Sequence, residues 1–454
     1  MFYSAISRSV PDPFLKEYDV FTHRKHLAGA VLALGLLVTA CSSPGGDSAG
    51  AADTSSESNA AAKALGIDLA ACPTDVTKAF GTTVKVGNTI PQTGPVAPAL
   101  GGIGPAMKEA FRQFNETSGL GTTFELVQGD DAFTPDKALT TTQTLLDKDG
   151  VDLITGVVGT AQVAAIRGVL GGECVPLMPG ISGGTSANNP AEYPWTSVFT
   201  QPSALDARIM MASINENHPD GANVAVLYSN NESGKDYLSA LEKYAGKSKI
   251  VKTETIEATE TGSPSSQITT LRSTGATVVI AVPTAAQCAS TMQEVSNQGW
   301  NADRYMSSVC ASLTFDVAGA AANGWHITTY AKDPTRGEFV NDPVVVTAID
   351  SIKKASPSTP ITTTTMTGFL YPQPFFEAAK VAAKSPLGLS RLGMMDAVTH
   401  LDFQPALLKP GVKFKLDGLK DQVAIEASYL SVYNSDTKLF EDGKLYDFEG
   451  QMTG

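Results

Sequence analysis

The chain has 454 residues and a net charge of −13, with 42% hydrophobic and 17% charged residues. This length and composition predict a globular protein with enough chain for two domains that each bury a core. The acidic balance argues against nucleic acid as a partner, because the phosphate groups would be repelled.

Residues 1–41 are predicted to be a targeting segment and not part of the fold. Arg24 and Lys25 precede an apolar run, residues 27–40, which is too short to span a bilayer. The run ends in Val38-Thr39-Ala40-Cys41. Small residues before a cysteine resemble the lipobox of a bacterial lipoprotein, in which Cys41 would carry acyl chains such as palmitate and anchor the protein to a membrane. The alternative is an ordinary signal peptide with an incidental cysteine.

Residues 42–79 are predicted to be a flexible spacer and N-terminal extension. As far as Ala62 this segment has no aromatic residue and no aliphatic residue beyond alanine.

The segment from Thr83 to Glu116 predicts a strand, a loop rich in Gly and Pro, and a helix. Val84, Val86 and Ile90 are spaced as in a strand. Met107 begins an apolar series with the i, i+3, i+4, i+7 spacing of a helix. In an open α/β sheet such loops lie at the carboxyl ends of strands, where ligands bind.

The strand–loop–helix pattern then repeats, which predicts βαβ units and a mostly parallel sheet. The number of strands favours two helix-covered sheets over the alternative of one large sheet. The expected strands are residues 123–128, 151–158, 175–178, 222–228, 250–256, 276–282 and 326–330, with tail strands at 414–416 and 426–433, the latter at a sheet edge. The expected helices are residues 135–146 after a cap at Thr134, 161–170, a helix opened by a capping box at Ser203–Asp206, 235–244, 266–273, 285–298, 342–355 and 368–383.

Motifs for catalysis, metal or cofactors are mostly missing. The five histidines have no metal-ligand spacing, and the dinucleotide fingerprint fails at Met107. Ser182 lies in a G-x-S-x-G motif, but Asn188-Asn189-Pro190 follows where a nucleophile elbow needs a helix. We interpret Asp130-Asp131 as a helix-capping or hinge-facing turn. The sequence therefore predicts no enzyme, no cofactor and no metal, and an enzyme using Ser182, the Asp pair or His326 is a minor alternative.

Five motifs in order resemble the branched-chain amino acid type of periplasmic binding protein, which has the type I fold. After the lipobox and spacer these are residues 84–115, FELVQGDD at 124–131, LITGVVGTA at 153–161, VPLMPGISGGT at 175–185 and YPWTSVFTQ at 193–201. The resemblance implies two Rossmann-like lobes with parallel sheets and a three-stranded hinge. Lobe 1 would comprise residues 80–203 and 332–415, and lobe 2 residues 204–331 and 416–454.

The resemblance also implies the ligand site and the disulfides. Small loops at strand ends would let backbone N–H groups and hydroxyls reach an anionic group such as a carboxylate. The residues expected at the ligand are Thr93, Gly159, Thr160, Ser182, Gly183, Gly184 and Thr185 in lobe 1, and Asn231, Glu232, Ser233, Pro283 and Thr284 in lobe 2. Apart from Cys41 the chain has four cysteines, and an even number in an exported protein favours disulfides. Cys72–Cys174 and Cys288–Cys310 are the pairings that would stay within one lobe or at its edge, and four free thiols are the alternative.

The implied function is a lipid-anchored, extracytoplasmic receptor, a monomer, that delivers a small polar or carboxylated solute to an ABC permease and its ATPases. A sensor of the same fold is the alternative. The family's tyrosine is replaced by Ser233 before Gly234, and its ammonium-binding glutamate is absent from Ser307 to Cys310. Because a buried unpaired ammonium is costly, an α-amino acid ligand would need Glu232 or Asp131 as a substitute.

Overall fold

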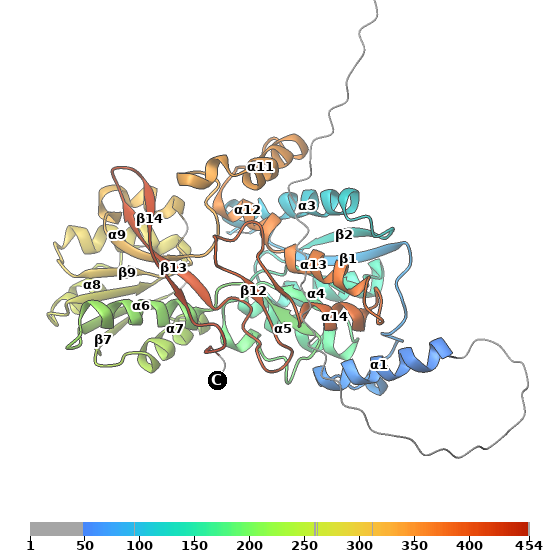
Figure 1. Ribbon diagram of the computed structural model, residues 1–454. Helices are drawn as coiled ribbons and strands as arrows, with labels where there is room; N and C mark the ends of the chain where they lie inside the picture. Colours follow the sequence, from blue (N-terminus) through green and yellow to red (C-terminus); the bar gives the residue numbers. More distant parts are fainter. Residues whose placement is uncertain (1–48, 95, 258–259, 261, 311, 453–454) are drawn as a thin grey trace, which may run out of the picture.

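The computed structural model describes residues 49–452, apart from residues 95, 258–259, 261 and 311. The predicted targeting segment and Cys41 lie outside these residues. Figure 1 shows two lobes side by side, each built on its own helix-covered sheet. This confirms the predicted two-lobe α/β fold with parallel sheets, and the single-sheet alternative is wrong.

The sheet of lobe 1 has five strands in the order β2-β1-β3-β4-β5, and every pair in it is parallel. Its strands are β1 (Thr83–Ile90), β2 (Thr123–Asp130), β3 (Leu153–Ile154), β4 (Leu177–Gly180) and β5 (Thr196–Val198). The predicted strand at 151–158 forms ladder pairs only at β3, with one further bridge between Val158 and Ile181. Beyond β3 the chain leaves the ladder to form the loop that precedes the next helix.

Helices cover both faces of this sheet, as parallel strands require. Val84 and Val86 face a core shared with α3 and the C-terminal helices, whereas Ile154 packs in a second core with α4 and α5. The helices are α2 (Ala97–Leu100), α3 (Ile103–Thr117), α4 (Pro135–Thr144), α5 (Thr160–Gly172), α11 (Pro343–Ala355), α12 (Thr363–Leu370), α13 (Gln373–Ala382) and α14 (Arg391–Val398). The predicted helix 368–383 is in fact two, because Pro372 and Pro374 interrupt it.

The sheet of lobe 2 has seven strands in the order β14-β13-β10-β9-β8-β6-β7. They are β6 (Asn223–Ser229), β7 (Lys249–Ile256), β8 (Val278–Val282), β9 (Asp303–Met306), β10 (Trp325–Thr329), β13 (Ala427–Asn434) and β14 (Leu439–Asp447). β13 runs antiparallel to β10 and to β14, and the other pairs are parallel. β13 was expected at the sheet edge. This was wrong, because the largely polar β14 pairs outside it and gave no strand signal.

Alternating residues of β6 face opposite sides of this sheet. Val224 and Val226 pack towards α6 and α7, whereas Ala225 and Leu227 pack towards the helices on the other face. The helices are α6 (Ser203–Asn217), α7 (Glu232–Lys243), α8 (Ser265–Arg272), α9 (Cys288–Asn297) and α10 (Ser312–Ala318). Among the described residues, no helix combines the length and apolar character needed to cross a membrane.

The chain passes between the two sheets three times: after β5, after β10, and between β12 (Phe414–Lys415) and β13. β12 pairs only with the short β11 (Asp402–Phe403) and not with either main sheet. An aromatic contact lies at these crossings, where the rings of Phe199 and Phe414 are 5.3 Å apart. The sequence places both disulfides correctly, since Cys72 is bonded to Cys174 and Cys288 to Cys310.

The expected flexible spacer is helical from Ala49 onward, where α1 (Ala49–Leu65) packs against α14 at the margin of lobe 1 (Figure 1). Ser58, Ala62 and Leu65 are buried and spaced so that they share one helix face. Alanine has the highest helix propensity, so the alanines that were taken as spacer composition instead favour this helix.

Candidate functional site

The loops at the carboxyl ends of β3 and β4 form the centre of the candidate site in lobe 1. Gly159 has φ 115°, a backbone conformation that favours glycine, and α5 begins at the next residue, Thr160. Gly159 supplies no side-chain cap to α5. The first-turn N–H groups of this 13-residue helix therefore lack a capping side chain from that residue, and a helix start of this kind favours an anion.

Ser182 and Gly184 come from the loop after β4 and join Thr160. The Ser182 hydroxyl donates to Thr160 Oγ1 at 2.9 Å and accepts the N–H of Gly184 at 3.2 Å. A Cβ on Gly184 would lie 2.5 Å from the Thr160 methyl group, so only glycine allows the two loops to approach this closely. Gly183 packs against the first crossing, where its carbonyl accepts the N–H of Ser203 at 2.9 Å.

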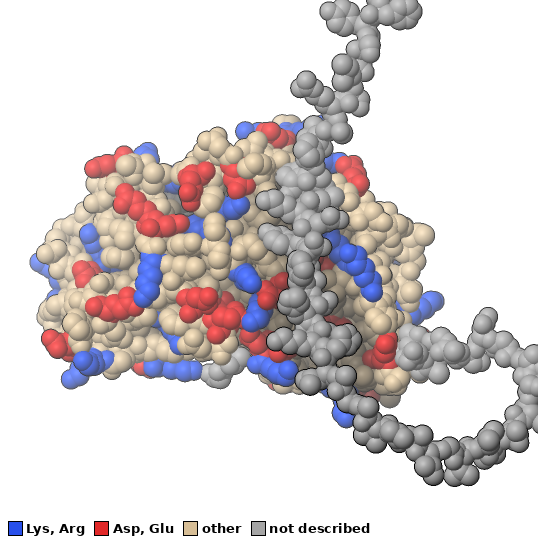
Figure 2. Space-filling model, in the orientation of Figure 1, with Lys and Arg blue, Asp and Glu red and all other residues tan. Residues whose placement is uncertain are grey.

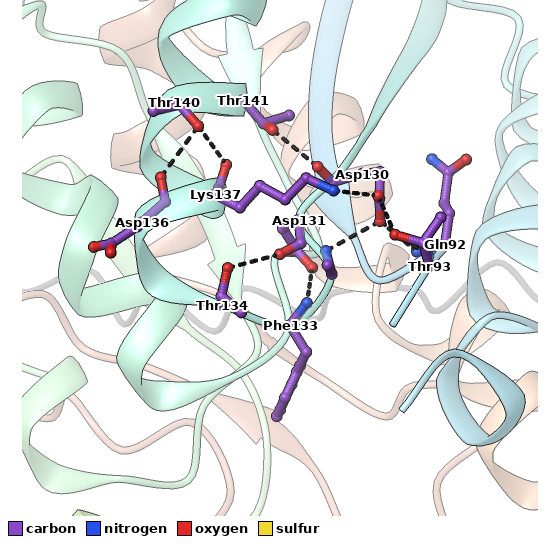
Figure 3. Close-up of polar contacts among 11 residues, drawn as sticks. Gln92, Thr93, Asp130, Asp131, Phe133, Thr134, Asp136, Lys137, Thr140 and Thr141 are labelled. Carbon is purple, nitrogen blue, oxygen red and sulfur yellow. Dashed lines mark hydrogen bonds and ion pairs between the residues drawn. The ribbon is translucent and has the colours of Figure 1, made fainter. Parts of the chain in front are cut away.

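Thr93, which was also predicted to lie at the ligand, is held by Asp130 (Figure 3). Its hydroxyl donates to Asp130 Oδ2 at 2.6 Å, and Lys137 of α4 donates to the same oxygen at 2.6 Å. Burial alone would raise the pKa of Asp130, but the hydrogen bonds from Lys137 and Thr93 hold it well below its ordinary value. Asp130 thus ties the loop after β1 to α4, in agreement with its interpretation as a structural turn.

The same turn presents Phe133, which the sequence analysis missed. Ala132 and Phe133 both have positive φ values, 46° and 59°, and such strain in non-glycine residues often accompanies functional loops. Asp130 and Asp131 stabilise the turn by accepting the N–H groups of Ala132 and Phe133 (Figure 3). The Phe133 ring edge would lie 3.2 Å from a Cβ at Gly159, so it borders the start of α5. The sequence signal that could have identified Phe133 is an aromatic residue just beyond an acidic pair at the end of a strand.

The predicted ligand residues of lobe 2 are engaged in their own loops. Asn231 is the N-cap of α7, where its Oδ1 accepts the N–H of Gly234 at 2.9 Å, and Glu232 is exposed. Thr284 forms a capping box with Gln287 at the helix that follows β8. Ser233 lies in the first turn of α7, and Pro283 lies in the loop between β8 and Thr284.

A buried carboxylate in lobe 2 was also missed. Asp206 was assigned to a capping box with Ser203; this was wrong, because the N-cap of α6 is Pro202, which gives no side-chain cap. Asp206 is fully buried and accepts the Tyr237 hydroxyl at 2.6 Å, together with the N–H of Ser308 at 2.8 Å and the Thr328 hydroxyl at 2.7 Å. Burial raises the pKa of Asp206, against the effect of these donors. Asp206 and Tyr237 thus lie beside Ser308, where the family's glutamate was sought.

The two lobes touch directly at Thr185. Its N–H and its hydroxyl both donate to the carboxylate of Asp236 on α7, each at 3.0 Å. Because Thr185 follows β4 and Asp236 belongs to lobe 2, this pair spans the space between the lobes.

Outside this region, the described residues contain one group of side chains with metal-ligand spacing: Asp421, Glu426 and Glu449. Glu449 is paired with Lys415, and burial raises the pKa of Glu426 to about 7. These charges are therefore already reduced or paired. A hollow of about 540 Å³ on lobe 1 is lined mainly by the start and outer face of α3, including Lys108 and Arg112, together with Gln128 and Ser356, and no residue of lobe 2 lines it. Figure 2 shows Lys and Arg interspersed with Asp and Glu on the face displayed, so neither sign dominates that face.

The model of the periplasmic binding protein family matches residues 83–438. The chain belongs to this family. The match includes both sheets except for β14, which begins just after it. A search of curated proteins found no sequence match.

Solved structures share the fold at low sequence identity. A branched-chain amino acid ABC transporter protein from Thermus thermophilus with bound valine has a TM-score of 0.70 and 15% identity, covering 82% of this chain and 98% of that one. A fatty acid ABC transporter substrate-binding protein from Thermomonospora curvata has a TM-score of 0.68 and 18% identity, covering 84% and 97%. A solute-binding protein from R. palustris in complex with 4-hydroxybenzoate has a TM-score of 0.65 and 16% identity, covering 80% and 97%.

Proposed function

We propose that this periplasmic binding protein captures a small carboxylated or polar solute between its lobes and delivers it to an ABC importer. The observation that carries the proposal is the start of α5, where first-turn N–H groups that receive no side-chain cap from Gly159 adjoin Thr160, Ser182 and Gly184. These N–H and hydroxyl groups can donate hydrogen bonds and are not paired with a catalytic base, which favours binding over turnover. Ser182 bonds to Thr160 and not to a base, and His326 instead stacks on Tyr305 in lobe 2.

A carboxylate is the shared chemistry of the ligands named for the structural neighbours: valine, a fatty acid and 4-hydroxybenzoate. In this chain a carboxylate would accept hydrogen bonds from the first turn of α5 and from the Thr160 hydroxyl, beside Gly159, Gly183 and Gly184. Phe133 would supply an apolar surface next to them. Because Asp206 is fully buried and already accepts three hydrogen bonds, we propose a carboxylate ligand that needs no ammonium partner.

We further propose a location and partners for the protein. The family places the protein outside the cytoplasm, and the Cys41 motif supports a lipid anchor in the cell membrane. The partners would be a permease and ATPases, with the receptor acting as a monomer. Lobe closure would present the ligand to the permease.

Thermal shift and calorimetry with valine, hexanoate and 4-hydroxybenzoate test this function. A ligand raises the melting temperature by mass action, so at least one of the three acids is expected to do so. Thr160→Val removes the hydroxyl and keeps the volume. It is expected to weaken that acid about tenfold or more, because hydrogen bonds to charged groups contribute about 1.5–3 kcal/mol.

The matched control is Thr117→Val on an exposed turn of α3, which is expected to leave affinity unchanged. Equal affinity in the Thr160 variant and the wild type would place the ligand elsewhere. Turnover of a bound acid would contradict a pure binding role.

A further inference from the structure

The Thr185–Asp236 pair uses the donors that the binding loop of lobe 1 would otherwise offer to a ligand. Both donors of Thr185 point to one carboxylate, which accepts through Oδ1 and Oδ2. A bidentate arrangement of this kind resembles the way in which a protein loop binds an anionic group. Here the anion is a side chain of the protein itself.

The pair adjoins the proposed carboxylate site. Thr185 follows Gly184, whose backbone approaches the Thr160 side chain and whose N–H is held by Ser182. Asp236 lies one turn into α7 and is half-buried. The neighbouring cation Lys235 is directed to Glu232 at 3.7 Å, and no ion pair with Asp236 occurs among the residues that the structure describes.

We propose that Asp236 is a specificity-determining residue that occupies the Thr185 end of the cleft and excludes a second anionic group from it. This inference rests on the proposed function, since it concerns the same cleft. The ligand's carboxylate is confined to Thr160, Ser182 and the start of α5. A dicarboxylate would bring its second charge towards Asp236.

Two physical effects act against such a second charge. Like charges repel in a partly desolvated cleft, where screening is weaker than in water. A second carboxylate also finds the donors of Thr185 already used, so it would be desolvated without a replacement hydrogen bond. Specificity built on an unfavourable contact of this kind needs no additional attraction for the preferred ligand.

The first experiment needs no ligand. Hydrogen exchange of the Thr185 amide is measured in the purified protein, in Asp236→Ala and in Glu242→Ala. Glu242 is an exposed carboxylate further along α7, so its removal matches the change in charge. The Thr185 amide is expected to exchange at least about tenfold faster in Asp236→Ala only. Equal rates in all three proteins would overturn the proposal.

The second experiment compares hexanoate with adipate, which carries a second carboxylate on a chain of the same length. The wild type is expected to bind hexanoate at least about tenfold more tightly. Asp236→Asn is expected to reduce this preference to about threefold or less, whereas Glu242→Gln preserves it. An unchanged preference in Asp236→Asn would overturn the proposal.

The two experiments separate this proposal from the proposed function. If no protein binds either acid, the carboxylate ligand class is wrong. The exchange result then decides whether Asp236 accepts the Thr185 N–H in solution. Faster exchange in Asp236→Ala supports this contact, and unchanged exchange overturns it.

Discussion

The strand-end loops of the two lobes use their polar groups differently. In lobe 1, α5 starts without a side-chain cap from Gly159, next to the hydroxyls of Thr160 and Ser182. In lobe 2, Asn231 caps α7, and Thr284 forms a capping box with Gln287. The loop before α5 therefore leaves its helix start without this cap, whereas the corresponding loops of lobe 2 cap their own helices.

Two carboxylates of lobe 2 that bind other groups lie outside these two capped loops. Its buried carboxylate, Asp206, holds Tyr237, Ser308 and Thr328 together, and Asp236 reaches across to lobe 1. In the proposed function, lobe 2 would therefore contribute structure and closure, and lobe 1 would contribute recognition.

The disulfides allow the lobes to be compared directly. Cys72–Cys174 spans 102 residues and Cys288–Cys310 spans 22. Because a longer closed loop restricts the unfolded chain more, replacing the first pair by alanines should cost about 4–5 kcal/mol and replacing the second about 3 kcal/mol. Urea unfolding of the two double variants measures both costs. A larger loss for the second pair would contradict this order.

Asp206→Ala removes the acceptor of the buried network in lobe 2. It leaves the Tyr237 hydroxyl and two other buried donors without a partner, so we expect a loss of about 4 kcal/mol in the free energy of unfolding. Asp206→Asn retains one acceptor oxygen and should lose about half as much. Asp220→Ala, at an exposed carboxylate in the same lobe, should change stability by less than about 0.5 kcal/mol. Similar stability in all three variants would show that the network contributes little.

Glu426, at the third crossing, makes stability depend on pH. Burial raises its pKa from 4.5 to about 7, and the negative charges of Asp421 and Glu449 add to this, against the N–H groups of Gly450 and Met452. Below about pH 4.5 the group is protonated in both states, so its stabilising contribution is complete. As the pH rises through 7 the unfolded chain has already released the proton, and about 3 kcal/mol of stability is lost.

Glu426→Gln cannot ionise and should not show this loss. Between pH 4 and pH 8, urea unfolding should therefore show the wild type losing about 3 kcal/mol relative to this variant. Asp436→Asn, at an exposed turn, should follow the wild type. Parallel pH profiles for the wild type and Glu426→Gln would contradict the assignment.

Much of the fold was predictable from local patterns. The i, i+3, i+4 spacing from Met107 gave α3, and the apolar runs gave most strands of both sheets. The errors occurred where tertiary packing overrides local signals. β14 is mostly polar because it lies at the edge of the sheet, and α1 depends on packing against α14.

The site was predictable only as a set of loops. The sequence predicted Gly159, Thr160 and the Ser182–Thr185 loop as ligand residues because small residues follow strands, but it could not say which of their polar groups already have partners in the folded protein. That depends on distant partners such as Asp130 for Thr93 and Asp236 for Thr185.

The sequence by itself determined the repeated strand–loop–helix pattern and the division into two sheets, because periodicity and residue type act over short stretches of chain. The cysteine pairs followed only from the assignment of residues to lobes. Only the tertiary structure decided that Asp206 is buried and that Asp236 meets Thr185. Each of these contacts joins residues at least 31 positions apart, and the free energy of a buried or bridging carboxylate depends on what surrounds it in space.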